Sequence, residues 1–303
     1  MSLRPWLDGF AELRDELTAL QGQARLDRLN ALAYATGLKN VCGLALRFVD
    51  QTDLRPGQSY EGHIAITGRV PTRSSGDGAI HDLYNALMWL RWPQSKARLN
   101  ALHVQALHNG QDEKGRSQRP GVRGRLRDRL TLFDESGLVW VCEDASLNEA
   151  LQRFRWQELF VARRAELLGN LTVAVFGHAV LQKLEQPYKA ITAHALILAS
   201  PATAALPLLD ARLARALADF ADHTASIPVI PLEGGPALLC PIPVLGLPGW
   251  SPDNRDPGFY ADEKIFRRGR RPGLQSAPER VGRSLRVPAP GEEGPDSGGQ
   301  GAG

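Results

Sequence analysis

Apolar residues recur at three- and four-residue intervals along most of this chain, and this helical spacing limits the possible folds more than any other feature. Leu7, Phe10, Leu13 and Leu17 are one example of the pattern. Pro93 stands between two such segments, at a position that proline favours as the first residue of a helix. The spacing predicts helices over residues 7–20, 24–34, 80–92, 94–108, 147–154, 156–168, 178–185, 189–199 and 208–221.

Strand-like segments are fewer, and they do not alternate strictly with the predicted helices. Residues 44–49, 60–67 and 171–176 are the predicted strands. Residues 130–133 and 138–141 flank Asp134-Glu135-Ser136-Gly137, which is typical of a β-hairpin with Gly137 in the left-handed conformation. The sequence therefore favours an α+β fold, mostly helical with a small mixed or antiparallel sheet, over a doubly wound parallel sheet.

The composition changes sharply near the C-terminus. Residues 269–303 hold nine Gly, five Pro and no aromatic residue, so they cannot bury enough apolar surface to offset the entropy of ordering them. We expect a single globular domain over residues 1–268 and a disordered Gly/Pro-rich tail over residues 269–303. The polar, Arg-containing segment 109–124 is expected to be a flexible surface insertion.

Charge and composition exclude several classes of protein. The 36 Lys and Arg residues exceed the 33 Asp and Glu residues by only three, so a nucleic-acid partner is not expected. Residues 190–209 carry no charged side chain and could span a bilayer by length, but Pro201 and Pro207 interrupt them, and we expect a buried helix and a loop rather than a membrane segment. The acidic N-terminus does not resemble a secretion signal, and Cys42, Cys142 and Cys240 form no CxxC motif, so a cytoplasmic location is expected.

The predicted helix 80–92 carries the most informative polar residues. Its apolar face holds Ile80, Leu83, Leu87 and Leu90, and the opposite face collects His81, Asp82, Asn85, Trp89 and Trp92. A face that mixes aromatic and polar side chains is typical of a ligand pocket. The alternative is a helix that packs between two layers of the fold, with its His and Asn side chains hydrogen-bonded to backbone groups.

Further candidate residues lie in three later segments. Lys96 and Asn100 lie one turn apart on the next helix and could bind an anionic group. The alternative is that the aliphatic part of the Lys96 side chain packs at the edge of the core and only its ammonium reaches solvent. His178 follows Phe176-Gly177 at the start of a helix. His194 lies among apolar residues on the predicted helix 189–199, where a histidine is more often a core residue than a ligand.

Several long motifs carry a resemblance to a known family. They are YEGHIAITGRVPTR at 60–73, HDLYNALMWLRWPQSKARLNALH at 81–103, LTLFDESG at 130–137, FGHAVLQKLEQPYKAITAHAL at 176–196 and PIPVLGLPGW at 241–250. Residues 30–266 resemble a bacterial family that is known only as domain of unknown function 3025, and the resemblance implies no activity. The chain departs from the family pattern at Gln182, where Glu is expected, and at Ser136, where Asn is expected.

Two functions remain open from the sequence. The first is a metal-dependent hydrolase, in which His81, His178 and His194 bind Zn²⁺ or Fe²⁺, with Asp82 as a fourth ligand. Asn85 and Lys96 would then orient a small-molecule or anionic substrate beside the catalytic His81, Asp82 and His178. The second is a non-catalytic domain that binds a small ligand or a partner through a pocket at Trp89 and Trp92. A nuclease that uses the Arg-containing segment is less favoured because the net charge is small.

Overall fold

The computed structural model describes residues 4–109, 124–226 and 239–268, and these belong to one compact unit, Met1–Arg270. The predicted tail and nearly all of the predicted surface insertion lie outside the described residues. The helices are α1 (Ala11–Ala19), α2 (Gly22–Ala35), α3 (Tyr60–Thr67), α4 (Ala79–Arg91), α5 (Pro93–Asn109), α6 (Arg125–Ser136), α7 (Ala145–Gln152), α8 (Arg164–Asn170), α9 (His178–Lys183) and α10 (Leu206–Ser226). The strands are β1 (Arg47–Asp50), β2 (Arg69–Thr72), β3 (Gly137–Val141), β4 (Thr172–Val175), β5 (Thr192–Leu198) and β6 (Cys240–Pro243).

Two small sheets organise this unit, and the α+β class predicted from the sequence is confirmed. β1 and β2 form a parallel pair, whereas the larger sheet has the order β4-β3-β5-β6. In that sheet β3 and β5 are parallel, and β4 and β6 are antiparallel to their neighbours, so the sheet is mixed. All five residues of β3 are buried, as expected for a central strand that is covered on both faces.

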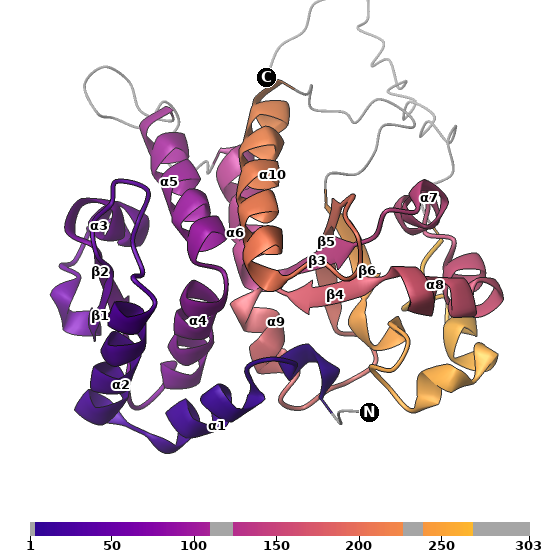
Figure 1. The fold of residues 1–303 in the computed structure, drawn as a ribbon, viewed down its shortest axis with the longest axis horizontal. Helices are drawn as coiled ribbons and strands as arrows, with labels where there is room; N and C mark the ends of the chain where they lie inside the picture. The colour runs from indigo at the N-terminus through magenta and orange to yellow at the C-terminus, as the bar shows by residue number, and fades with distance from the viewer. Residues whose placement is uncertain (1–3, 110–123, 227–238, 269–303) are drawn as a thin grey trace, which may run out of the picture. The chain divides into compact units, whose positions relative to one another are not determined.

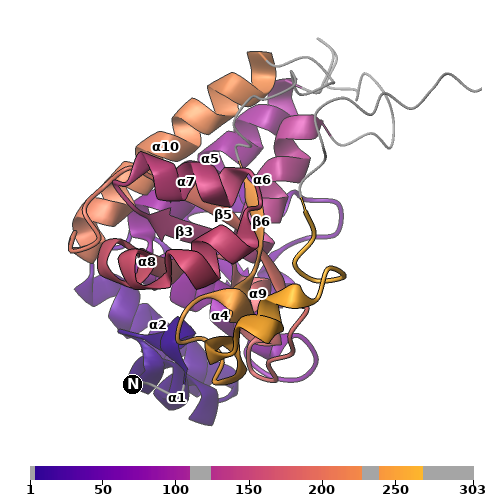
Figure 2. The ribbon, with the colours of Figure 1, turned by 90° about the vertical axis from the view of Figure 1, so that its right-hand side faces the viewer.

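The helices lie on both sides of the larger sheet. Elements α1 to α5 gather on one side, and α7 and α8 lie at the other side, as Figures 1 and 2 show. The two long helices α5 and α10 pack side by side. The short helix α9 lies between the two parts and contacts both α4 and α6. Within the described residues, no helix is both long enough and apolar enough to cross a membrane.

Residues 60–67 form helix α3, so the predicted strand is wrong. Ser59 caps the helix by accepting a hydrogen bond of 3.2 Å from the amide of Gly62, and Gly68 ends it with a φ of +68°. In the helix Ile64 is buried, whereas Ile66 is 80% exposed. The caps at both ends therefore favour the helix over the predicted strand.

The predicted hairpin around residues 134–137 is also wrong. Helix α6 continues to Ser136, and β3 begins at the next residue, so no turn separates them. Gly137 has a φ of −68°, which any residue can adopt. Glycine is needed there for space, because a Cβ atom would lie 2.3 Å from the carbonyl oxygen of Phe133.

Residues 192–198 form strand β5 rather than the helix predicted over residues 189–199. β5 lies between β3 and β6, and most of its residues are buried. A strand that is covered on both faces reads as a continuous apolar run, and periodicity cannot separate such a run from a buried helix. Other elements agree with the predictions, among them α2, α4, α5 with Pro93 at its start, β4 and α10.

Candidate metal centre

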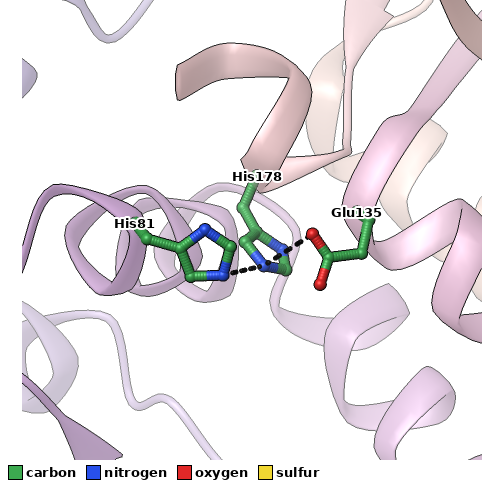
Figure 3. Close-up of side chains that lie close together, drawn as sticks. All are labelled: His81, Glu135 and His178. Atoms are coloured by element: carbon green, nitrogen blue, oxygen red, sulfur yellow. Dashed lines mark hydrogen bonds and ion pairs between the residues drawn. The ribbon is translucent and has the colours of Figure 1, made fainter. Parts of the chain in front are cut away.

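Three side chains from three helices converge where α4, α6 and α9 meet. His81 lies in the first turn of α4, Glu135 in the last turn of α6, and His178 is the first residue of α9. Figure 3 shows the three side chains pointing toward one another. One ligand atom from each residue lies within 4.8 Å of the other two. Among the described residues, this is the one group of three or more His, Cys, Asp or Glu side chains that is spaced to hold a metal ion.

Gly177 allows this close approach. Its amide and that of Phe176 both donate to the carbonyl of Gly137, over 2.8 Å and 3.0 Å. A Cβ atom at Gly177 would lie 2.4 Å from the amide nitrogen of Gly137 and 2.6 Å from the carbonyl oxygen of Glu135. The backbone before His178 thus packs directly on the junction between α6 and β3, and only glycine fits there.

The distances agree with the spacing of metal ligands. The Nε2 atoms of His81 and His178 are 3.1 Å apart, and Nε2 of His178 lies 3.7 Å from Oε2 of Glu135. With bonds of about 2.1 Å, neighbouring ligands lie roughly 3.4 Å apart around a tetrahedral ion and roughly 3.0 Å apart around an octahedral one. Two imidazoles and one carboxylate are a ligand set that Zn²⁺ and Fe²⁺ accept.

Gln182 orients the ring of His81. Oε1 of Gln182 lies 3.1 Å from Nδ1 of His81, and an amide oxygen can only accept a hydrogen bond. In this arrangement Nδ1 donates to Gln182, and Nε2 faces His178. Metal-ligating histidines usually donate a hydrogen bond from their second ring nitrogen in this way. The Glu-to-Gln departure in the family pattern thus falls on a residue that touches a candidate ligand, and not on one of the three ligands.

Burial sets the charge state of the cluster. Burial lowers the pKa of His178 to about 4, although the nearby carboxylate of Asp134 opposes this effect. His178 is therefore neutral at pH 7, and neutral imidazole is the form that binds metals. Burial also raises the pKa of Glu135, and its side chain is 42% exposed, so the centre opens to solvent on this side.

Lys96 and Asn85 lie next to the cluster in a chain of polar contacts. Nζ of Lys96 donates to Oδ1 of Asp134 over 2.5 Å and to Oδ1 of Asn85 over 2.8 Å. Asn85 in turn donates to the hydroxyl of Tyr60 over 2.9 Å. The carboxyl of Asp134 is partly buried, which alone would raise its pKa, but the charge and hydrogen bond of Lys96 together with the neighbouring His178 and His103 outweigh this, and the pKa is lowered.

Lys96 is placed differently from the substrate-binding lysine that the sequence suggested. Its side chain is only 4% exposed, and its ammonium lies 5.5 Å from the ring centre of Trp89. The contacts of Lys96 are therefore internal, and its ammonium has almost no exposed surface for an anionic group.

Two of the candidate ligands lie outside the cluster. The carboxylate of Asp82 accepts three hydrogen bonds from Arg73, at 2.7 Å from its amide and at 2.9 Å and 2.7 Å from its guanidinium. His194 lies on β5, where its Nδ1 is 3.1 Å from the hydroxyl of Ser136. The structure therefore brings together His81 and His178 of the three proposed histidines, without His194 or Asp82.

Trp89 and Trp92, which were expected to line a ligand pocket, are core residues. Both side chains are buried in the core, and the indole of Trp92 donates to the carbonyl of Val175 over 3.2 Å. Ile80, expected on the apolar face, is 37% exposed instead. Two surface hollows of about 520 and 470 Å³ lie elsewhere, one beside Arg212 on α10 and one between α2 and β1, and neither is lined by a residue of the cluster.

Sequence reasoning missed Glu135 and Asp134, whereas Gln182 was noted only as a departure from the family pattern. Asp134 and Glu135 were interpreted as turn residues of a hairpin, yet they occupy the last turn of α6. The signal that could have found them is an acidic pair at the C-terminal end of an amphipathic segment, directly before a buried strand. This signal is visible only once residues 130–136 are recognised as helix.

Comparisons with known proteins identify the family. The sequence matches a family described as protein of unknown function, DUF3025, over residues 46–270. The match includes every residue of the cluster and its polar neighbours. No curated protein and no solved structure matches this chain significantly. The match spans well over half of the chain, and the chain therefore belongs to the DUF3025 family.

Proposed function

We propose that this protein is a metal-dependent hydrolase whose Zn²⁺ or Fe²⁺ ion is held by His81, Glu135 and His178. The observation that carries the proposal is the convergence of these three side chains from α4, α6 and α9, with ligand atoms within 4.8 Å of one another. Two imidazoles and a carboxylate that converge from separate parts of the sequence form a ligand set suited to a metal ion.

The ligand set and the exposure of the centre support hydrolysis. Two histidines and one carboxylate leave at least one coordination position open, which is typical of catalytic rather than structural sites. A bound metal ion supplies an activated water and polarises the bond to be cleaved. The 42% exposure of the Glu135 side chain gives a small substrate access to the open position. Of the residues assigned a catalytic role from the sequence, His81 and His178 act as metal ligands in this proposal. Lys96 contacts Asp134, which lies beside His178, and Asn85 contacts Lys96.

The proposal is tested by measuring metal content and affinity. We expect the purified protein, stripped of metal and dialysed against Zn²⁺, to retain about one ion per chain by plasma mass spectrometry. The variants His81→Gln, Glu135→Gln and His178→Gln should each lose the ion. His194→Gln should retain it, because this histidine contacts Ser136 outside the cluster. His63→Gln is a second control, because His63 lies on α3 and pairs with Asp53, away from the cluster.

The catalytic part is tested with p-nitrophenyl acetate and bis(p-nitrophenyl) phosphate. Hydrolysis that requires added Zn²⁺ or Fe²⁺ and disappears in His178→Gln supports the proposal. A wild-type protein that binds neither ion would refute the metal centre. Stoichiometric binding without metal-dependent turnover of either probe would count against hydrolysis and favour a binding role.

We also propose a cytoplasmic location, which suits the exposed thiol of Cys42.

A further inference from the structure

A buried nitrogen of His178 lacks a hydrogen bond. Nδ1 of this ring is inaccessible to solvent and makes no hydrogen bond of acceptable geometry, although the backbone of Asp134 lies close enough to His178 to oppose the lowering of its pKa. When Nε2 of a histidine binds a metal ion, the proton of the neutral ring must be on Nδ1, and a buried N–H group needs an acceptor. The centre proposed above therefore requires an acceptor next to Nδ1.

Asp134 is placed to be that acceptor. Its Oδ2 lies 3.9 Å from Nδ1 of His178, about 1 Å beyond an ordinary hydrogen bond. The other oxygen of the same carboxylate, Oδ1, accepts from Nζ of Lys96 over 2.5 Å. The two oxygens thus face different partners, and the contact with Lys96 determines which way Oδ2 points.

Lys96 is itself held in place. Asn85 accepts its second hydrogen bond over 2.8 Å, and the rings of Trp89 and Phe176 lie 5.5 and 5.9 Å from the ammonium. With 4% of its side chain exposed, Lys96 has little freedom to turn away from Asp134. A buried charge costs stability unless it is paired, and Asp134 is the carboxylate that pairs with Lys96.

We propose that Lys96 is a positioning residue of the metal centre, which holds Asp134 so that Oδ2 accepts the Nδ1–H hydrogen bond of the metal-bound His178. This inference rests on the proposed function, since it needs a metal ion at His81, Glu135 and His178. It replaces the substrate-binding role that the sequence suggested for Lys96. Outer carboxylates of this kind fix the ring and raise the basicity of the ligating nitrogen.

The test measures metal binding in Lys96→Met, Asp134→Asn and the double variant. We expect each single variant to bind Zn²⁺ roughly 10- to 100-fold more weakly in competition with a chromophoric chelator. The double variant should be no weaker than the worse single variant, because both changes interrupt the same contact. The visible absorption bands of the Co²⁺-loaded protein should shift in each variant. Lys96→Arg should restore part of the affinity, because it keeps a cation beside Asp134.

Lys189→Met is the matched control. Lys189 also pairs with an aspartate, Asp262 at 3.5 Å, and its ammonium lies 4.3 Å from the ring centre of Phe259, but it is not part of the cluster. A purely structural role for Lys96 would lower the urea midpoint and leave the Co²⁺ bands unchanged. That result, or Zn²⁺ affinity within twofold of the wild type, would overturn the inference.

Two further outcomes separate this inference from the proposed function. If the wild type binds neither Zn²⁺ nor Co²⁺, both are wrong. If the wild type binds them and the variants bind equally well, only the role of Lys96 is wrong. Should Lys96→Met fail to fold by circular dichroism, Asp134→Asn decides alone, because it preserves the size of the side chain.

Discussion

The amide of Gly177 donates a hydrogen bond of 2.8 Å to the carbonyl of Gly137, and this contact places His178 beside Glu135. Gly137 begins β3 directly after α6, and Gly177 immediately precedes α9. Two glycines that are 40 positions apart in the sequence thus bring two of the three candidate ligands together. The contact is between backbones, so neither position has room for a side chain.

Substituting Gly177 by alanine tests this contact. The new Cβ would lie within 2.6 Å of three backbone atoms, none of which can turn aside, so we expect a loss of about 1–3 kcal/mol in the free energy of unfolding. Zn²⁺ affinity should fall as His178 moves away from Glu135. The urea-unfolding control is Gly169→Ala on α8, where a Cβ atom meets nothing within 4 Å and stability should stay equal or rise. Equal stability of the two variants would contradict the close packing at Gly177.

His103 should make stability depend on pH. It is buried on α5, and burial lowers its pKa from the ordinary value of 6.5. The carboxylates of Asp134 and Glu61 oppose this effect, whereas Arg127 and Lys96 reinforce it. Because the unfolded chain binds the proton more readily, the contribution of His103 is complete above about pH 6.5 and is lost as the pH falls below it.

The measurement is the free energy of unfolding in urea between pH 5 and 7. His103→Gln should reduce the slope with pH by up to about 1.4 kcal/mol per pH unit, the value for one proton. His108→Gln, at an exposed position on the same helix, should leave the slope unchanged. Identical slopes in wild type and His103→Gln would show that His103 titrates alike in the folded and unfolded chains.

The three cysteines should react very differently with thiol reagents. Cys42 is exposed, whereas Cys142 and Cys240 are buried, and burial raises the pKa of Cys142 and raises that of Cys240 to about 12. We expect Ellman's reagent to modify one thiol per chain under native conditions and three in guanidinium chloride. Cys42→Ser should abolish the native reaction. Fast modification of a second thiol would indicate opening near β3 or β6.

Residues 269–303 should contribute little to the stability of the unit before them. Their composition predicts this, and the compact unit of the structure ends at Arg270. A chain that ends at Arg268 should melt within about 4 °C of the full-length protein, a limit that corresponds to roughly 1–2 kcal/mol for a chain of this size. A larger drop in calorimetry would mean that the terminal segment packs on the domain.

The amino-acid sequence alone predicted the elements whose pattern is local and long. The helices α2, α4, α5 and α10 follow directly from apolar spacing, as does the polar side of α4 that carries His81 and Asn85. The pairing of His81 with His178 follows from the same reasoning, since a polar face beside a core needs polar partners. The helices depend on residues within one or two helical turns, which the sequence contains, whereas His81 and His178 are 97 residues apart, and the sequence offered only their need for polar partners.

Only the tertiary structure decided the rest of the site. Residues 130–133 and 192–198 are short, mostly apolar segments, and their choice between helix and strand depends on packing against the rest of the fold, which local periodicity does not reveal. Because the first segment is helical and the second is a strand, Glu135 belongs to the cluster and His194 lies outside it. The Asp134 carboxylate accepts a hydrogen bond of 2.5 Å from Lys96, which lies on another helix. Side-chain direction at such a junction is set by long-range packing, so the candidate ligands could be assigned only after the chain had folded.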